Sequence, residues 1–224
     1  MPRNLIAPHK WMHSKERFLI LLCLILGLVV IVPILNRFTA VRLFLDIFLT
    51  ANFISMVYVV SNKKGFVIAG FLLVAVMFVA FWMQYFFPNR IIAAIGMLTG
   101  VFFVGLVISS ILGSMFRSDR VDREIIYMAI LLYLLAALMW AFLYTFLELL
   151  EPASFNIDLG HPKGFFLVFQ YYSFVTITTL GYGDITPVTE VAKAFSVLEA
   201  VCGQLYLVVV VAWLVGMHVS NKSR

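Results

Sequence analysis

The stretch TITTLGYGDITP, from Thr176 to Pro187, decides the fold because it is polar while the segments on either side of it are apolar. It contains two glycines, four threonines and one aspartate, in a 224-residue chain that is 63% hydrophobic. Its position needs a physical reason. Non-helical backbone at membrane depth is tolerated only where protein buries it or where it lines an aqueous path.

The composition predicts that lipid, not water, surrounds most of the chain. The mean hydropathy is +1.05, and only 12% of the residues are charged, so a soluble domain of this length could not bury the apolar surface. The net charge of +5 comes from short basic clusters beside apolar runs. Such clusters are typical of membrane topology, so we expect no nucleic-acid partner.

Six apolar segments have about the 20 residues that a membrane-spanning helix requires. They cover residues 18–35, 41–60, 66–87, 91–116, 125–149 and 191–218. The first is long enough to span the membrane, and we expect no cleaved signal peptide. The interval 151–189 is too polar for a seventh span. Its run GFFLVFQYYSFVTI (Gly164–Ile177) is about half a span long and predicts a re-entrant segment.

The basic residues predict the orientation. If the six helices alternate, eleven of the sixteen Lys and Arg residues fall on one side. The positive-inside rule places that side in the cytoplasm, with both termini, and the interval 151–189 outside. The expected multi-pass protein of the cell membrane has a cytoplasmic N-terminus (1–17), a four-helix region (18–122) and a pore region (123–224), with no evident soluble partner.

The segment Thr179–Gly183, TLGYG, carries the chemistry. A protein that strips a cation of its water must offer replacement oxygens, and successive backbone carbonyls serve if they face one axis. Gly181 and Gly183 can adopt left-handed backbone values without steric penalty, which allows the carbonyls of residues 179–182 to point the same way. The Thr179 hydroxyl adds a further oxygen.

The apolar half-span supports this segment. A short helix over about 164–176 would aim the negative end of its dipole at the pore axis, where it favours a cation. Tyr171 and Tyr172 are expected to pack behind the filter, where Tyr182 can also reach. Together the three rings would form an aromatic cuff that holds the pore diameter.

The run TTLGYGD (Thr178–Asp184) resembles the potassium-channel signature, whose TVGYG loops select ions with backbone carbonyls. Here Leu180 stands where valine is common. The order of six spans, with a re-entrant loop between the last two, resembles the voltage-gated-like superfamily. The run LEAVCGQLYLVVVVAWLVG (Leu198–Gly216) resembles the inner helix of bacterial members. The resemblance is strong over the last hundred residues and weak over the first 120.

The resemblance implies an all-α membrane protein in which four chains surround one pore. K⁺ would bind at Thr179, Leu180, Gly181 and Tyr182, with Gly183 completing the filter. Thr178 and Asp184 would support the filter, and Asp184 would stand at its outer mouth. The alternative for Asp184 is an ordinary solvated carboxylate. Other acidic residues expected outside are either an acidic vestibule or solvated loops: Glu148, Glu151, Asp158 and Glu190.

Two residues of the last span carry open hypotheses. Glu199 lies about 15 Å deep at 1.5 Å per residue, and an ionisable group there is a functional candidate. We expect it behind the filter, bonded to a hydroxyl such as that of Thr176 or to Tyr206; the alternative is a protonated structural acid. Gly203 matches the family's inner-helix glycine and is either a gating hinge or a site of close helix packing.

The first four spans are not expected to sense voltage. A sensor needs charges in the field, each worth about 2.3 kcal/mol per 100 mV. The fourth span has no Arg or Lys between Arg90 and Arg117. These spans would then serve packing, lipid contact or assembly, and the gating stimulus stays open.

The prediction is a homotetrameric potassium-selective channel that conducts passively, is not gated by voltage, and contacts membrane lipid. Its only cofactor would be K⁺ in the filter, with no organic group. A cytoplasmic constriction is expected near Val208–Val211 or Leu214, and His161 is a weak candidate for proton sensitivity. The alternatives are a potassium transporter subunit, a non-selective cation channel and a membrane scaffold. No nucleophile–base pair, metal spacing or phosphate loop suggests an enzyme.

Overall fold

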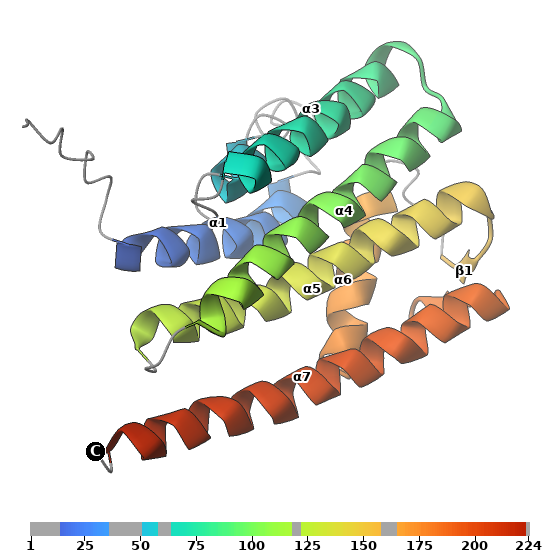
Figure 1. Ribbon diagram of the computed structural model, residues 1–224. Coiled ribbons are helices and arrows are strands. Elements are labelled where there is room, and N and C mark those ends of the chain that lie inside the picture. The colour runs from blue at the N-terminus through green and yellow to red at the C-terminus, as the bar shows by residue number, and fades with distance from the viewer. Residues whose placement is uncertain (1–13, 36–50, 58–63, 118–121, 158–164, 223–224) are drawn as a thin grey trace, which may run out of the picture.

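The computed structural model describes residues 14–35, 51–57, 64–117, 122–157 and 165–222. These residues are almost entirely helical (Figure 1). The elements are α1 (Ser14–Leu35), α3 (Lys64–Phe86), α4 (Arg90–Met115), α5 (Arg123–Leu150), β1 (Phe155–Asn156), α6 (Phe165–Ile177), β2 (Thr186–Pro187) and α7 (Glu190–Lys222). Residues 51–57 are also helical.

Five helices in the described part of the chain are long and apolar enough to cross a membrane. They correspond to the predicted first, third, fourth, fifth and sixth spans. The predicted second span, 41–60, lies mostly outside the described residues, although its residues 51–57 are helical. The prediction of an all-helical fold with several apolar helices of membrane-spanning length is confirmed for the described residues, whereas the count of six spans stays a prediction.

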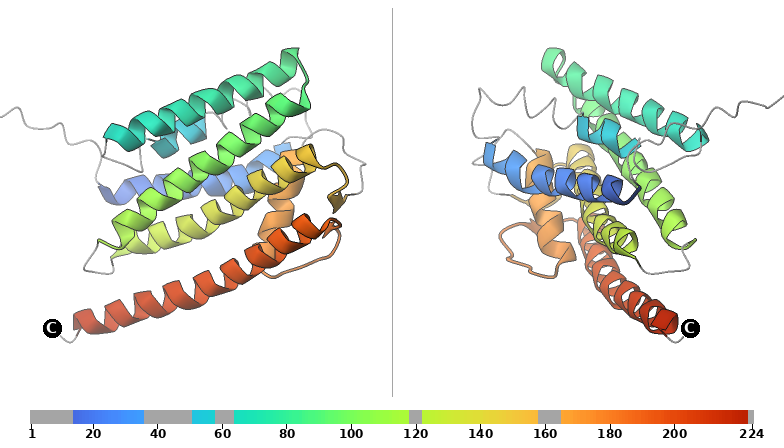
Figure 2. Two further views of the ribbon diagram at one scale, coloured as in Figure 1. Left: turned by 45° about the vertical axis from the view of Figure 1, so that its right-hand side comes forward. Right: turned by 90° about the vertical axis from the view of Figure 1, so that its left-hand side faces the viewer.

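The long helices form a layered bundle around α5 (Figure 2). α4 packs between α3 and α5, while α1 packs directly on α5. The buried core is continuous across these helices and includes Leu21 of α1, Phe103 of α4 and Leu135 of α5. The predicted boundary at residue 122 therefore separates two helices that share one core.

Polar residues set where α4 and α5 begin. The Asn89 carboxamide oxygen accepts a hydrogen bond from the Ile91 amide at 2.8 Å, and the Asp122 carboxylate accepts one from the Ile125 amide at 3.1 Å. Both satisfy amides that have no partner within the first turn of a helix. The chain thus turns back at each end of the bundle.

The ends of the helices alternate as the sequence predicts. The beginning of α3, the end of α4 and the C-terminal end of α7 lie at one end of the bundle, at the left in Figure 1. The turn from α3 to α4, the paired strands β1 and β2, and the beginning of α7 lie at the other end. The side of the membrane to which each end belongs stays a prediction.

The short α6 lies across the bundle and contacts both α5 and α7. Its 13 residues match the predicted half-span within one residue at each end. The strands β1, after α5, and β2, before α7, pair antiparallel, with Phe155 opposite Pro187 and Asn156 opposite Thr186. This pair ties the loop after α5 to the loop before α7, so the segment after α6 is held at both ends.

A proline in α1 leaves a carbonyl that α6 uses. Pro33 has no amide hydrogen, so the Val29 carbonyl four residues earlier lacks its partner within the helix. The Gln170 side-chain amide of α6 donates to that carbonyl at 3.4 Å. Gln170 is only 2% exposed. The first span is therefore attached to α6 by a hydrogen bond that Pro33 makes possible.

Candidate functional site

The backbone of the predicted filter alternates in handedness. Thr179 and Gly181 both have φ of 58°, and Gly183 has φ of 77°, with ordinary values between them. Glycine takes left-handed values freely, but for threonine they cost about 1–2 kcal/mol. The glycine spacing predicted the alternation at two positions. Nothing in the residue type pointed to Thr179 as the third.

Hydrogen bonds to α6 orient the same segment. The amide of Thr179 donates to the Thr176 carbonyl at 2.9 Å, and the amides of Leu180 and Gly181 donate to the Val175 carbonyl at 3.0 and 3.2 Å. The described residues contain no cis peptide bond. In a trans peptide the carbonyl points opposite to the amide. The carbonyls of residues 178–180 therefore point away from α6.

The filter residues are exposed in the single chain. Leu180 is 55% exposed and Tyr182 is 66% exposed. A Cβ atom added to Gly181 or Gly183 would meet nothing within 4 Å. The carbonyl oxygens of residues 178–180 thus face an open side of the filter. In the single chain, α7 lies beside this side through Gln204.

Three side chains at the start of the filter form a hydrogen-bonded series. The Thr178 hydroxyl donates to the Phe174 carbonyl at 2.6 Å, and the Thr179 hydroxyl donates to the Thr178 carbonyl at 2.7 Å. The side-chain amide of Gln204, from α7, donates to the Thr179 hydroxyl oxygen at 3.2 Å. Sequence reasoning missed Gln204. The signal was its polar side chain inside an otherwise apolar stretch of α7.

Asp184 is bonded to α6 at the far end of the filter. The Tyr171 hydroxyl donates to its carboxylate at 2.7 Å. This hydrogen bond is the main cause that raises the pKa of Tyr171 to about 12, because it favours the neutral phenol. Asp184 is thus attached to the helix that precedes the filter.

Tyr172 points to different neighbours. Its hydroxyl lies 2.7 Å from the Ser196 hydroxyl of α7, and its ring packs edge-on against Tyr144 and Phe155. Tyr171, by contrast, is exposed and reaches Asp184. Tyr171 and Tyr172 therefore face different sides of α6, as successive residues of a helix do. The aromatic cuff of Tyr171, Tyr172 and Tyr182 stays a prediction.

Glu199 is fully buried between three helices. The Tyr144 hydroxyl of α5 donates to one carboxyl oxygen at 2.6 Å, and the Ser173 hydroxyl of α6 contacts the other. The expectation of an α6 hydroxyl was right in kind, but the residue is Ser173 and not Thr176. The Tyr206 hydroxyl donates instead to the Ala129 carbonyl.

The hydrogen bonds around Glu199 depend on whether its carboxyl group carries a proton. The Ser173 hydroxyl lies within hydrogen-bond distance of two acceptors, Glu199 and the Ala137 carbonyl at 2.7 Å, yet it has a single hydrogen. A protonated Glu199 would donate to Ser173, which would donate to Ala137. Tyr144 would donate to the remaining carboxyl oxygen. Each of the three close contacts then has its own hydrogen, whereas an ionised Glu199 would leave two hydrogens for three contacts.

Gly203 allows α7 to approach the end of α6. A Cβ at this position would lie 2.5 Å from the Ile177 carbonyl oxygen, well inside contact distance. The same oxygen accepts a hydrogen bond from the Tyr133 hydroxyl at 2.9 Å. α7 continues through Gly203 as one 33-residue helix. Of the two hypotheses for this glycine, the structure supports close packing directly beneath the filter.

The acidic residues expected outside have separate surroundings. The Glu148 carboxylate accepts hydrogen bonds from the amides of Ala153 and Phe155 and so holds the turn after α5. Glu190 pairs with Lys193 at 2.8 Å, and Glu151 is exposed. Asp158 and His161 lie outside the described residues. Across the part of the chain that the structure describes, His, Cys, Asp and Glu form no group suited to a metal ion.

Comparison with known families finds a match over the region that carries this geometry. A family model described as "Ion channel" matches residues 127–219, from the first turns of α5 to the last turns of α7. No curated protein and no solved structure matches the chain. The match supports ion-channel function in a multi-pass membrane protein, and it favours transport over catalysis.

Proposed function

We propose that four copies of the chain form a potassium-selective channel with six spans per chain and passive conduction through the filter Thr179–Gly183. The observation that carries this proposal is the backbone of that segment. Alternate residues are left-handed, and the carbonyls of Thr179 and Leu180, like that of Thr178 before them, point away from α6. Rings of such carbonyls replace the hydration shell of K⁺ in potassium channels.

The surroundings of the filter suit a dehydrated cation. α6 ends beside it, so the negative end of the helix dipole lies next to the ion path. Gln204 directs the Thr179 hydroxyl hydrogen towards the Thr178 carbonyl and leaves oxygen lone pairs for the innermost K⁺. Asp184, bonded to Tyr171, adds negative charge at the outer mouth.

The proposed stoichiometry rests on what one chain leaves open. Most residues of the filter and of α7 are exposed in the single chain. Exposed apolar residues of α7 include Val201, Leu205, Val208 and Val211. In a tetramer, part of this surface contacts neighbouring chains and part lines the pore, with the constriction near Val208–Val211 or Leu214.

We further propose that Glu199 is a neutral structural acid. An isolated carboxylate is costly to bury away from water, and the protonated form supplies a hydrogen to each of the three close contacts around it. In that state Glu199 links α5, α6 and α7 behind the filter without placing charge near the ion path. Gly203 acts with it by letting α7 pack under α6.

The channel is not gated by voltage in this proposal. α4 carries no basic residue between its first residue, Arg90, and Arg117 beyond its end.

Both termini are cytoplasmic in this proposal, as the excess of basic residues on that side predicts. A ring contact between Phe116, after α4, and Trp213 of α7, with centroids 5.8 Å apart, connects the first helices to the cytoplasmic half of α7.

Reconstitution in planar bilayers tests the proposal. With K⁺ on one side and Na⁺ on the other, each tenfold preference for K⁺ moves the reversal potential by about 59 mV for a monovalent ion. We expect a shift of at least this size, with the sign of K⁺ selectivity. A reversal potential near zero would show a non-selective pore. Gly216→Ala, far from the filter, serves as a matched control for filter variants.

A further inference from the structure

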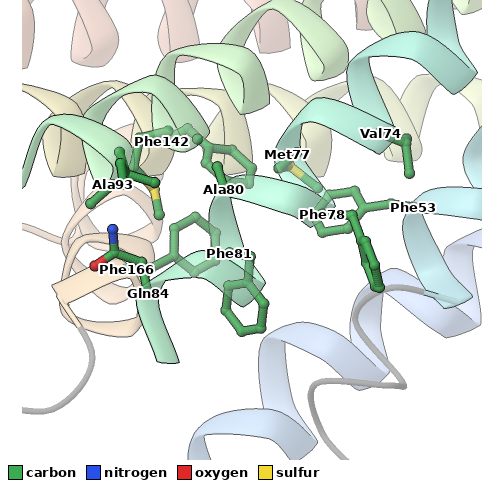
Figure 3. Close-up of a pocket in the computed structure, with 13 residues that line it drawn as sticks. Phe53, Val74, Met77, Phe78, Ala80, Phe81, Gln84, Ala93, Phe142 and Phe166 are labelled. Atoms are coloured by element: carbon green, nitrogen blue, oxygen red, sulfur yellow. The ribbon is translucent and has the colours of Figure 1, made fainter. Parts of the chain in front are cut away.

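An apolar pocket lies between α3 and α4, apart from the filter (Figure 3). It has a volume of about 140 Å³. Small residues, Ala80, Ala93 and Gly96, create the space. Phenylalanine rings from several helices form much of the wall, and Gln84 is the one polar residue that lines it.

The pocket is elongated along α3. Its lining on that helix runs from Val74 to Gln84, which corresponds to about 15 Å at 1.5 Å per residue. Figure 3 places Gln84 and Ala93 at one end, away from Val74 and Phe53. A linear hydrocarbon suits this shape better than a compact ligand does.

The Gln84 end of the pocket lies at the turn between α3 and α4. The Gln84 side-chain amide donates to the Asn89 carbonyl at 2.7 Å, and the next residue, Arg90, is exposed. The pocket therefore has a polar end at Gln84, where the helices end, and an apolar interior further along them, while Arg90 begins α4 at the same turn. This order matches the order of headgroup and tail in a phospholipid.

We propose that this pocket binds one acyl chain of an anionic phospholipid, whose phosphate group lies beside Arg90. An empty apolar cavity leaves its wall atoms without contacts, and a hydrocarbon chain supplies them. Phe78 is 40% exposed and opens the pocket towards the lipid-facing side of α3. Arg90 then makes a charge-assisted hydrogen bond to the phosphate.

The bound chain contacts the link between the first helices and α6. Phe142 of α5 and Phe166 at the beginning of α6 line the pocket, and their ring centroids are 4.5 Å apart. The Phe142 ring lies over Gly100 of α4, where an added Cβ would come within 2.6 Å of it. Occupancy therefore stabilises the position of α6, whose other end holds the filter.

Photolabelling of the full-length protein tests the proposal. The probe is phosphatidylglycerol with a diazirine in the middle of one acyl chain, included in phosphatidylglycerol vesicles, with adducts mapped by mass spectrometry. We expect adducts to concentrate on the residues that line the pocket. Ala93→Leu fills the space and should lower this labelling about tenfold. Ala75→Leu makes the same change on the exposed face of α3, outside the pocket, and should leave it unchanged.

The headgroup and the folding of the variants have their own controls. Arg90→Ala should weaken labelling of the pocket, and so should a phosphatidylcholine probe. In both cases the labelled residues of α3 should stay the same. If Ala93→Leu does not assemble, Ala93→Met fills the same space with a more flexible side chain and carries the same expectation. Equal labelling of the pocket and of exposed Leu72 and Val79, insensitive to both fillers, would overturn the proposal. Labelling requires no ion conduction, so its result is independent of the proposed function.

Discussion

α5 and α7 differ in burial although both are apolar helices with 28-residue candidate spans. In the most apolar stretch of α5, 61% of the residues are buried, against 6% for α7. α5 lies between α4, α1 and α6, whereas α7 contacts the rest of the chain mainly near α6 (Figures 1 and 2). This difference is what the proposed assembly explains, because other copies of the chain would cover α7 and the filter.

The comparison also separates two kinds of residue. Those of α5 hold the chain together, and their loss should destabilise each subunit. Those of α7 and the filter act where copies meet, so the same change recurs in every subunit around the pore. The following predictions test that distinction, from the largest expected effect to the smallest.

Gly181→Ala should abolish selective conduction. The left-handed backbone at this position costs alanine about 1–2 kcal/mol per copy. This cost adds to the one that Thr179 already carries and recurs in each of the four chains, so the alternating conformation loses stability in the whole filter. No atom lies close enough to clash with the new Cβ, so assembly should persist. Single-channel recording and the native mass together check this. Normal K⁺ currents in the variant would contradict the role of the alternating backbone.

Gly203→Ala should disrupt the packing of α7 on α6. The new Cβ would lie 2.5 Å from the Ile177 carbonyl oxygen, and overpacking of this kind costs about 1–3 kcal/mol. We expect a lower thermal stability of the assembly and reduced current. The control is Gly216→Ala on the same helix, where nothing lies within 4 Å. If the two variants behave alike, close packing is not the role of Gly203.

Glu199→Leu and Glu199→Gln should separate charge from hydrogen bonding. Leucine leaves the buried Tyr144 hydroxyl without its acceptor, at a cost of about 1–3 kcal/mol. Glutamine can accept from Tyr144 and donate to Ser173, as a protonated acid does. We therefore expect thermal stability and conductance near the wild type for glutamine only. Equal damage from both variants would show that Glu199 acts as an anion.

Gln204→Leu should alter conduction without stopping it. The variant removes the donor to the Thr179 hydroxyl, a neutral hydrogen bond worth about 0.5–1.5 kcal/mol, while the carbonyls of the filter keep their bonds to α6. Single-channel conductance at several K⁺ concentrations measures the change in the innermost site. A complete loss of selectivity would mean that Gln204 shapes the whole filter.

The smallest expected effect concerns α1. Gln170→Leu should destabilise the fold by about 1 kcal/mol because the Val29 carbonyl loses its donor. In a Pro33→Ala background the restored amide can bond that carbonyl, so the cost of Gln170→Leu should nearly vanish. A double-mutant cycle of unfolding free energies measures this coupling. Additive effects would show that Pro33 and Gln170 act independently.

The sequence predicted what depends on local pattern. Hydropathy located the long helices that the structure describes, and glycine spacing located two of the three left-handed residues of the filter. Contacts between distant residues could not be predicted, because they depend on how the helices pack. Glu199 meets Tyr144, 55 residues away, only because α7 lies against α5 at that depth. Likewise, nothing near Pro33 indicates that Gln170 takes the carbonyl it frees.

The native mass of the assembly in a membrane mimetic tests the central claim most directly, because the exposed α7 and filter require partner copies. The account predicts a single species of four times the 25.4 kDa chain mass. Gly181→Ala should give the same mass, since it changes the ion path and not the contacts between chains. A monomer, a dimer or a trimer as the stable form would contradict the account.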